Sequence, residues 1–317
     1  MKIIAMTNKK GGVGKTTTAL STAAYFGQSG YSVLAIDMDA QGNFSQASGA
    51  KREEAGTFDF LRGAPPENCI QKMQKYDLLA ADSRLSRADK EFDQIGKEHL
   101  LQKALERVKG YDYVILDTSP AMNVLTMNAF TAADAAVVCC QTDSFSLAGL
   151  DDLMQNIELA QEYYNKELTV AGILLTRYDS RTSISGRTAE MFKERAKKLG
   201  TRVFETVIRE SVAIKESQLK QCDVFDYSAT CHAAEDYAAF TKELYIVLGG
   251  DKKKWQKGSP KQSAGGSPRI SIPRQPRKRT PTMRRRGPGE SASASRRIFR
   301  PRSMADCAAP RKDAAFP

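Results

Sequence analysis

Histidine, paired cysteines and long hydrophobic runs are scarce or missing in this 317-residue chain, and each shortage excludes a class of protein. With two histidines in all, the sequence offers no His-rich metal site. The six cysteines form no C-x-x-C pair, which argues against a zinc site or a disulfide framework and favours a reducing cytoplasm. No run approaches the ~18 apolar residues that a transmembrane helix needs. The apolar stretch at the N-terminus is too short for a secretory signal.

Positive charge is concentrated in the last part of the chain. Residues 251–317 hold 19 Lys+Arg and 4 Asp+Glu, a net charge of +15, whereas residues 1–250 hold 29 and 33, a net charge of −4. Nine of the twelve prolines follow Asp251, and large apolar residues are few there. We therefore predict a globular domain over residues 1–250 and a disordered Arg/Pro/Ser-rich tail over residues 251–317. A nucleic-acid arm, a polybasic membrane contact, a solvated appendage and the product of a shifted reading frame are all open interpretations of this tail.

Short apolar runs alternate with longer helical stretches through residues 1–250. The predicted strands are 2–7, 32–37, 78–80, 113–117, 135–140, 170–176 and 202–208. The predicted helices are 16–28, 100–108, 124–132, 147–164, 188–199 and 229–247. Several strands are apolar throughout, as expected when both faces of a sheet are covered. The pattern predicts an α/β fold with a doubly wound, mostly parallel sheet and flanking helices, in which ligands bind beyond the carboxyl ends of the strands.

A glycine-rich segment connects the first predicted strand to the first predicted helix. It reads Lys10-Gly11-Gly12-Val13-Gly14-Lys15-Thr16-Thr17. Glycines let backbone amides face an anion, and the start of the following helix adds free N–H groups and the positive end of its dipole. In such a phosphate loop, Lys15 reaches the β- and γ-phosphates and the Thr16 hydroxyl binds Mg²⁺. Lys9 stands where the standard pattern has its first glycine, so the ordinary spacing fails by one residue. A dinucleotide fingerprint is excluded, because Thr17 occupies the place of its third glycine.

Acidic residues end two further predicted strands. Asp37 and Asp39 lie at the end of the second strand, and Asp117 ends the strand 113–117. A carboxylate beside a phosphate loop is what a Mg²⁺–water shell requires, and Asp117 suits that role. We interpret Asp39 as the residue that orients the attacking water, and Asp37 as support for the Mg²⁺ shell or for Thr16. A helix cap or a turn is the alternative for any one of these aspartates alone.

These motifs resemble those of the ParA/MinD family of deviant Walker A ATPases, and the resemblance covers residues 1–248. Residues 10–17 resemble the deviant Walker A box, and residues 37–43 resemble the D-x-D-x-Q-G-N switch I. Residues 111–120 resemble the Walker B and switch II stretch. Residues 176–182 resemble a segment typical of the plasmid and chromosome partition branch, which includes the Soj-like ParA proteins.

The resemblance implies a weak ATPase that uses ATP and Mg²⁺ and is stimulated by a ParB-type partner. Lys10 would reach the phosphates of the partner subunit in an ATP-sandwich homodimer, and Asp39 would be needed for hydrolysis. The residues expected to hold the nucleotide are Lys10, Gly11, Gly12, Val13, Gly14, Lys15, Thr16 and Thr17 for the phosphates, and Thr176, Arg177, Ile208 and Arg209 near the adenine. The ATP-bound dimer would bind DNA nonspecifically in the cytoplasm, at the nucleoid of a bacterium, and would release it on hydrolysis. Such a cycle segregates plasmid, mobile-element or chromosomal DNA.

The residues expected to contact DNA depart from the pattern of the family. Ala213 stands where an arginine is common, so the cations that we expect to contact DNA are Arg181, Lys193, Lys197 and Lys215. The alternative function is a MinD-like membrane-cycling positioning ATPase, whose branch ends in a short amphipathic helix. Gly249-Gly250 and the prolines that follow argue against such a helix, whereas Lys252–Trp255 keeps this alternative open. An iron–sulfur relative would need ligating cysteines, whereas Cys139-Cys140 lie inside an apolar run and read as core residues. A DNA-binding regulator that does not hydrolyse ATP is a further alternative. The intact Lys15, Thr16, Asp39 and Asp117 argue against it.

Overall fold

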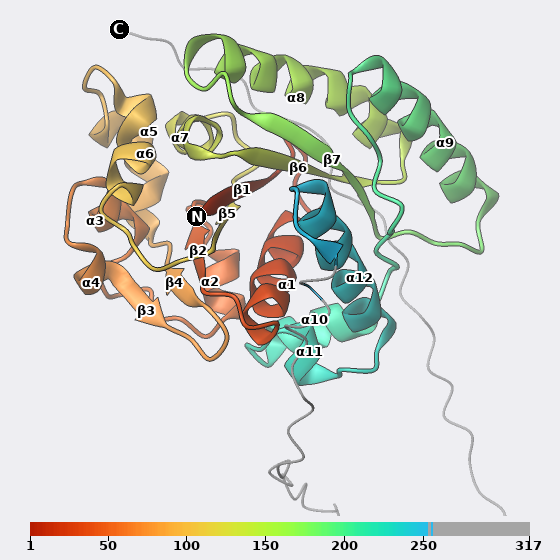
Figure 1. The fold of residues 1–317 in the computed structure, drawn as a ribbon, viewed down its shortest axis with the longest axis horizontal. Helices are drawn as coiled ribbons and strands as arrows, with labels where there is room; N and C mark the ends of the chain where they lie inside the picture. Colours follow the sequence, from red (N-terminus) through yellow and green to blue (C-terminus); the bar gives the residue numbers. More distant parts are fainter. Residues whose placement is uncertain (253–254, 256–317) are drawn as a thin grey trace, which may run out of the picture. The chain divides into compact units, whose positions relative to one another are not determined.

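The computed structural model describes residues 1–252 and residue 255. Within them, seven strands form one sheet in the order β3-β4-β2-β5-β1-β6-β7 (Figure 1). The strands are β1 Lys2–Thr7, β2 Val33–Asp37, β3 Ile70–Lys72, β4 Asp77–Leu79, β5 Tyr113–Asp117, β6 Ala135–Gln141 and β7 Thr169–Thr176. Across the sheet from β4 to β7, all neighbouring strands are parallel to each other. Only the edge strand β3 is antiparallel to its neighbour, β4. The predicted fold class is therefore confirmed.

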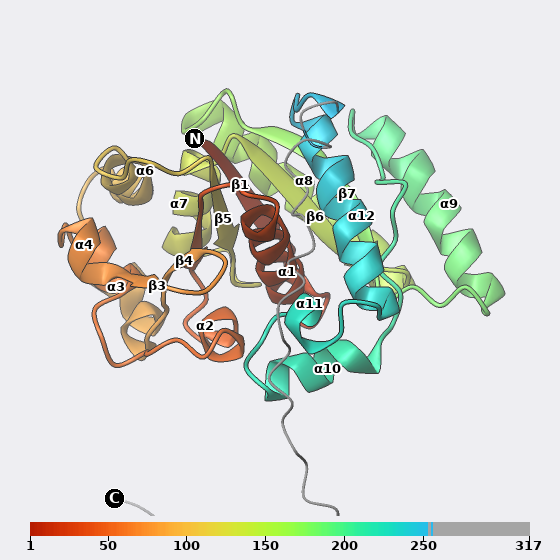
Figure 2. The ribbon, with the colours of Figure 1, turned by 60° about the horizontal axis from the view of Figure 1, so that its bottom comes forward.

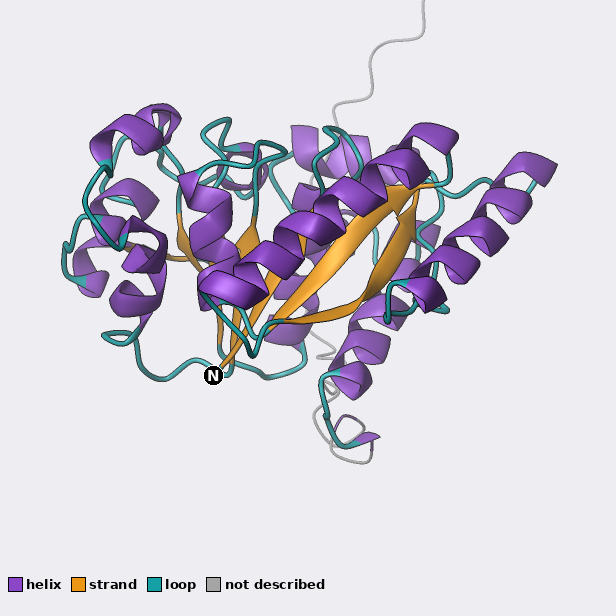
Figure 3. Ribbon diagram, turned by 90° about the horizontal axis from the view of Figure 1, so that it is seen from above, coloured by secondary structure: helices purple, strands orange, loops and turns teal. Residues whose placement is uncertain are grey.

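Helices cover both faces of the sheet (Figure 3). The α-helices are α1 Lys15–Gln28, α2 Asn43–Ala47, α3 Thr57–Leu61, α4 Pro66–Cys69, α5 Ala88–Glu91, α6 Leu100–Leu105, α7 Val124–Ala132, α8 Ser144–Tyr163, α9 Ser183–Lys198, α10 Val212–Leu219, α11 Val224–Tyr227 and α12 His232–Val247. Two 3₁₀ turns, η1 Ser83–Arg87 and η2 Lys97–His99, accompany them. Helices α10 and α11 lie together near α1 and α2 (Figure 2).

The strand pleat divides the core into two apolar layers. Ala5, Leu34 and Ile36 join the layer that is covered by α6, α7, α8 and α9. Ile4 and Ala35, their neighbours along the chain, join the layer covered by α1 and α12. Successive side chains of a strand point to opposite faces, so a strand buried on both sides must be apolar at every position. The strands of the sequence are continuously apolar because helices cover both of their faces.

One predicted strand, 202–208, is wrong. Within this segment the structure has one isolated parallel bridge, of Val203 with Ile173, and a second follows directly after it, of Arg209 with Tyr178. The N–H groups of Phe204 and Ile208 donate to the carbonyls of Ile173 and Leu175 on β7, each at 2.9 Å. Phe204 and Ile208 are nevertheless almost fully buried, at 2% and 1% exposure, and belong to the layer beside α12. The segment therefore runs beside β7 with scattered backbone hydrogen bonds rather than a continuous ladder, and its apolar pattern also reflects side-chain packing beside the last helix. The short elements α2, α3, α4, β3, α5, α10 and α11 and the turns η1 and η2 were not predicted.

Packing of the globular body continues past the predicted boundary after residue 250. Trp255, which the sequence analysis assigns to the basic tail, is only 7% exposed. Its ring lies against those of Tyr25, Tyr31 and Tyr245, with centroid distances of 5.9, 5.8 and 4.9 Å. The remainder of the predicted tail lies outside the described residues. No helix in the described part of the chain is long and apolar enough to cross a bilayer.

Candidate active site

The glycine-rich segment forms the turn between β1 and α1. Gly12 and Gly14 have φ angles of 75° and 88°, in the left-handed region that a residue with a Cβ rarely adopts. Gly14 precedes α1, and no side chain caps the helix there. The amides of the first helical turn have no partner within a helix, so here they remain available to a ligand. The loop and the start of α1 therefore offer free backbone N–H groups to an anion.

Side chains at the ends of neighbouring strands donate hydrogen bonds to the backbone of this loop. The Thr176 hydroxyl, at the end of β7, donates to the Val13 carbonyl at 2.7 Å. The Gln141 amide, at the end of β6, donates to the Gly12 carbonyl at 2.9 Å. Asn8 accepts from the Lys10 N–H through Oδ1, at 2.8 Å. Hydrogen bonds with Thr176, Gln141 and Asn8 therefore restrain the backbone of this loop.

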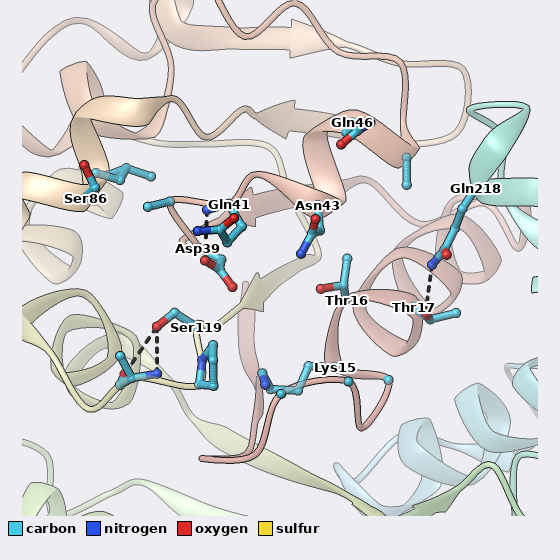
Figure 4. A pocket seen from close by; sticks show the side chains of 18 of the residues that line it. Lys15, Thr16, Thr17, Asp39, Gln41, Asn43, Gln46, Ser86, Ser119 and Gln218 are labelled. Carbon is cyan, nitrogen blue, oxygen red and sulfur yellow. Dashed lines mark hydrogen bonds between the residues drawn. The ribbon is translucent and has the colours of Figure 1, made fainter. Parts of the chain in front are cut away.

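The two lysines of the loop point in different directions. Lys15 is 6% exposed, and its ammonium donates to the Lys10 carbonyl at 3.1 Å, inside the turn (Figure 4). Burial lowers the pKa of Lys15, and the Asp117 carboxylate acts in the opposite direction. Lys10 Nζ instead lies 2.8 Å from Oδ2 of Asp143, the residue that caps α8. Lys15 is thus placed for a ligand in the same subunit, whereas Lys10 is held against α8.

Asp117 is a buried carboxylate. Its exposure is zero, and neither Oδ1 nor Oδ2 has a hydrogen-bond partner of ordinary length among the residues that the structure describes. Burial raises the pKa of Asp117 well above its usual range and the Asp37 carboxylate adds to the rise, whereas the nearby Thr16 hydroxyl and Lys15 ammonium oppose it. Leaving a buried charged group unpaired is costly, so a cation beside it would be strongly favoured. This orphaned carboxylate beside the phosphate loop fits the predicted Mg²⁺ ligand.

The described residues contain no set of three or more His, Cys, Asp or Glu side chains arranged to hold a metal ion. Mg²⁺ in nucleotide sites is typically held by one or two protein oxygens, phosphate oxygens and water, so a single carboxylate with the Thr16 hydroxyl suffices. Asp37 is also fully buried, but both of its oxygens accept hydrogen bonds, from Ser45 and from the Asp39 N–H. Burial raises the pKa of Asp37 to about 6. The role of Asp37 in the metal shell therefore stays a prediction.

A cavity of about 1010 Å³ opens above the loop. Ligand pockets range from ~300 to ~1,000 Å³, so this one has room for a nucleoside triphosphate. Its wall contains the residues Gly11, Gly12, Gly14, Lys15, Thr16, Thr17, Asp39, Gln41, Asn43, Ser86, Ser119, Lys215, Gln218 and Leu219, among others (Figure 4). Asp39 is 9% exposed, and its Oδ1 accepts from the Gln41 N–H at 3.0 Å. Lys15, Thr16 and Asp39 therefore meet on this wall, whereas Asp37 and Asp117 are fully buried and do not line it. Lys10 does not line it either, because its ammonium lies on Asp143.

Helix α10 is the part of the cavity wall that the sequence did not reveal. The Gln218 amide donates to the Thr17 hydroxyl at 3.1 Å, joining α10 to the start of α1 across about 200 residues of chain. Lys215 and Leu219 lie beside it on the same wall. The local signal was Ser211, a typical N-cap residue directly before α10, but nothing in the pattern connected this helix with the phosphate loop.

The four residues expected near the adenine are not on this cavity wall. Thr176 and Ile208 are each 1% exposed and pack beneath it. Arg177 and Arg209 form ion pairs, at 2.6 Å to Glu210 and 2.6 Å to Asp236. Val13 is likewise fully buried. The position of the base therefore remains a prediction.

The expected DNA-binding cations are all exposed, but most have a carboxylate partner. Arg181 pairs with Asp179 at 2.9 Å, and Lys193 pairs with Glu190 at 3.0 Å. Lys215 lies 3.8 Å from Glu210. Lys197 forms no ion pair with any residue that the structure describes, and it lies one turn after Lys193 on α9. Such exposed pairs are weak, so these cations remain free to exchange partners.

A glycine loop between the first strand and first helix of a parallel sheet, beside a cavity that Lys15, Thr16 and Asp39 line, defines a P-loop nucleotide-binding protein. A family model described as an AAA domain matches residues 1–170. The chromosome partitioning protein ParA of Caulobacter vibrioides is 36% identical over 253 residues, which cover 77% of this chain and 94% of that protein. The chromosome-partitioning ATPase Soj of Thermus thermophilus is 35% identical over 241 residues, 76% of this chain and 94% of that one. The chain therefore belongs to the ParA/MinD family of P-loop ATPases, in its Soj-like branch.

A solved structure with the same fold supports this assignment. The cobyrinic acid a,c-diamide synthase of Mycobacterium smegmatis, crystallised with an ATP analogue and magnesium, has a TM-score of 0.69 and 27% sequence identity. The match covers 80% of this chain and 98% of that one.

Proposed function

We propose that this protein is a ParA-type partition ATPase, which hydrolyses ATP to ADP and phosphate with Mg²⁺ and binds DNA nonspecifically in its ATP-bound, dimeric state. The observation that carries the proposal is the meeting of Lys15, Thr16 and Asp39 on one cavity wall around the glycine loop, with the buried Asp117 close enough to Lys15 to affect its pKa. The relatives named ParA and Soj, and the ATP analogue and magnesium of the synthase structure, support the same ligands.

Within the site, each residue has a task that its placement allows. The loop amides and Lys15 bind and orient the phosphates, which places the γ-phosphoryl group for in-line attack. Asp117 and Thr16 are the side chains that would hold Mg²⁺, and the ion supplies charge neutralisation on the transferring group. Asp39, on the cavity wall, orients the attacking water. Turnover would be slow in the isolated subunit, because Lys10 would have to leave Asp143 to reach the phosphates of a partner subunit.

Dimerisation explains how nucleotide state controls DNA binding. Nonspecific DNA affinity depends on the number of cations that contact phosphates, and two subunits together present twice as many as one. A γ-phosphate that attracts Lys10 from the partner subunit would stabilise the dimer, and hydrolysis followed by phosphate release would remove that attraction. A ParB-type partner would accelerate this step. The cycle would place the protein at the bacterial nucleoid while ATP is bound.

The membrane-cycling alternative receives no support from the described C-terminal residues. Helix α12 ends at Val247, and Trp255, the aromatic residue that could otherwise anchor this segment in a lipid surface, is buried against Tyr25, Tyr31 and Tyr245. Interfacial anchoring needs aromatic side chains that are free to enter the headgroup layer.

The decisive experiment is co-sedimentation with nonspecific DNA in ATP, in ADP and without nucleotide, over a series of salt concentrations. We expect binding in ATP alone, with an affinity that falls steeply as salt rises. The Lys15→Ala variant is the matched control, because it keeps every exposed cation but lacks the lysine that binds the phosphates. Equal binding in all nucleotide states would contradict the proposal, and sedimentation with anionic vesicles only in ATP would favour the membrane alternative.

A further inference from the structure

One buried carboxylate, that of Asp37, holds both ends of the loop that carries the hydrolytic residue. Asp37 ends β2 and has no exposed surface. Its Oδ1 accepts from the N–H of Asp39, at 3.2 Å, at the start of the loop. Its Oδ2 accepts two hydrogen bonds from Ser45 on α2, from the N–H at 2.9 Å and from the hydroxyl at 2.7 Å. Residues 40–44 lie between these two contacts, and Ala40, Gln41 and Asn43 among them line the cavity.

Ser45 extends this connection to the neighbouring strand. Its hydroxyl donates to Asp37 and accepts from the Ala81 N–H at 2.8 Å, so the group uses its single proton and one of its lone pairs. Thr57 adds a further contact, because its hydroxyl lies 2.9 Å from the Asp37 carbonyl and 3.1 Å from that of Leu79. Strand β2, helix α2 and the segment that follows β4 are thereby joined through buried hydrogen bonds, which are strong and directional in a low dielectric.

Local interactions alone would leave the loop poorly restrained. Gly42, which precedes α2, is left-handed at a φ of 65°, and no side chain caps the helix. A helix of only five residues is not stable by itself. The carboxylate of Asp37 supplies the missing restraint by accepting from Ser45 within the first turn, although it lies outside the helix.

We propose that Asp37 and Ser45 are positioning residues, which hold the loop so that Asp39 and Asn43 face the bound phosphates. Figure 4 shows both side chains directed into the cavity, opposite Lys15 and Thr16. This inference rests on the proposed ATP hydrolysis and assigns to Asp37 a task other than the metal shell. Neither residue contributes a side chain to the cavity wall, so their effect on chemistry passes through Asp39.

The expected signature is a loss of turnover without a loss of nucleotide binding. The phosphate loop makes no hydrogen bond to Ser45, so ATP should bind to a Ser45→Ala variant within about twofold of the wild type. A misplacement of ~1 Å at a reacting group costs up to ~100-fold in rate, so kcat should fall by ~10-fold or more. Restoring the hydroxyl with Ser45→Thr should recover most of kcat.

The experiment measures kcat, the affinity for a fluorescent ATP analogue and the thermal midpoint for the wild type, Ser45→Ala, Ser45→Thr and Asp37→Asn. The matched control is Ser48→Ala, which removes a hydroxyl at the end of the same helix that contacts Tyr76 at 2.8 Å and not Asp37. A selective fall in kcat for Ser45→Ala, absent in Ser48→Ala, supports the inference. If Ser45→Ala fails to fold, the isosteric Asp37→Asn must show the same selective fall.

Wild-type kcat in both Ser45→Ala and Asp37→Asn would overturn the inference alone. Parallel losses of binding, turnover and thermal midpoint that threonine does not reverse would overturn it as well, because they indicate a general structural role. A wild-type protein with no turnover would overturn the proposed function, and the inference with it.

Discussion

The ion pair between Lys10 and Asp143 makes a quantitative prediction about dimerisation. In the described subunit, Lys10 Nζ lies 2.8 Å from Asp143 Oδ2, and it also contacts the Ser146 hydroxyl at 3.4 Å. If Lys10 must cross to the phosphates of a partner subunit, this pair has to break before the dimer forms. Replacing Asp143 with asparagine should therefore favour the dimer. Asparagine still accepts from the Ser146 N–H, now 2.7 Å from Asp143 Oδ1, so α8 keeps its cap.

The size of the effect follows from the exposure of the pair. The Lys10 and Asp143 side chains are 38% and 34% exposed. Burial alone would raise the pKa of Asp143, but the hydrogen bonds from Lys10 and from the Ser146 N–H outweigh it and the net pKa is lowered. Solvent screens a pair of this exposure to ~0.2–1 kcal/mol. Two such pairs break in each dimer, so the dimer should be stabilised by ~0.4–2 kcal/mol, a ~2- to 30-fold lower dissociation constant.

The assay is sedimentation equilibrium in saturating Mg²⁺ and ATP, in an Asp39→Ala background so that hydrolysis does not deplete the dimer. The matched control is Asp152→Asn, which removes the neighbouring α8 partner of Lys9, at 3.6 Å, and does not touch Lys10. We expect the Asp143→Asn variant to dimerise more tightly than the control. An unchanged or weaker dimer would show that Lys10 does not have to leave Asp143, and the proposed crossing of this lysine would then be refuted.

Three further predictions test separate parts of the structure. Lys15→Ala should abolish nucleotide binding, because its buried ammonium is the cation of the phosphate loop; unchanged ATP affinity in equilibrium dialysis would contradict that role. Asp39→Ala should bind ATP normally but accumulate as a DNA-bound dimer, and ordinary phosphate release by this variant would remove Asp39 from the hydrolytic step. Trp255→Ala should lower the free energy of unfolding by ~3–5 kcal/mol, since it empties an aromatic cluster. Urea denaturation followed by circular dichroism measures this loss, and an unchanged midpoint would place Trp255 outside the folded body.

Much of the active site could be predicted because its chemistry is local in the chain. The turn at Gly14, the lysine that follows it and the helix that begins there are consecutive, so their order already specifies a phosphate loop. Asp117 could be placed beside that loop because parallel strands bring their carboxyl ends to one edge, and β1 does pair directly with β5. These inferences need only the period of the strands and the rules of sheet connection.

The rest depends on contacts between residues far apart in the chain. An apolar run such as 202–208 is compatible with a strand or with an irregular segment packed on a helix, and only the position of α12 decides between them. The same applies to Trp255, whose surrounding sequence is basic and rich in proline although its ring is buried.

By itself, the sequence determined the class of sheet and the phosphate loop, and it predicted the residues that carry the chemistry. Only the tertiary structure decided that Lys10 rests on Asp143, that Gln218 of α10 donates to Thr17 at the cavity wall, and that Asp37 connects to Ser45. The reason is physical: motif residues are set by backbone conformation over a few positions, whereas the partner of a side chain depends on how separate elements pack.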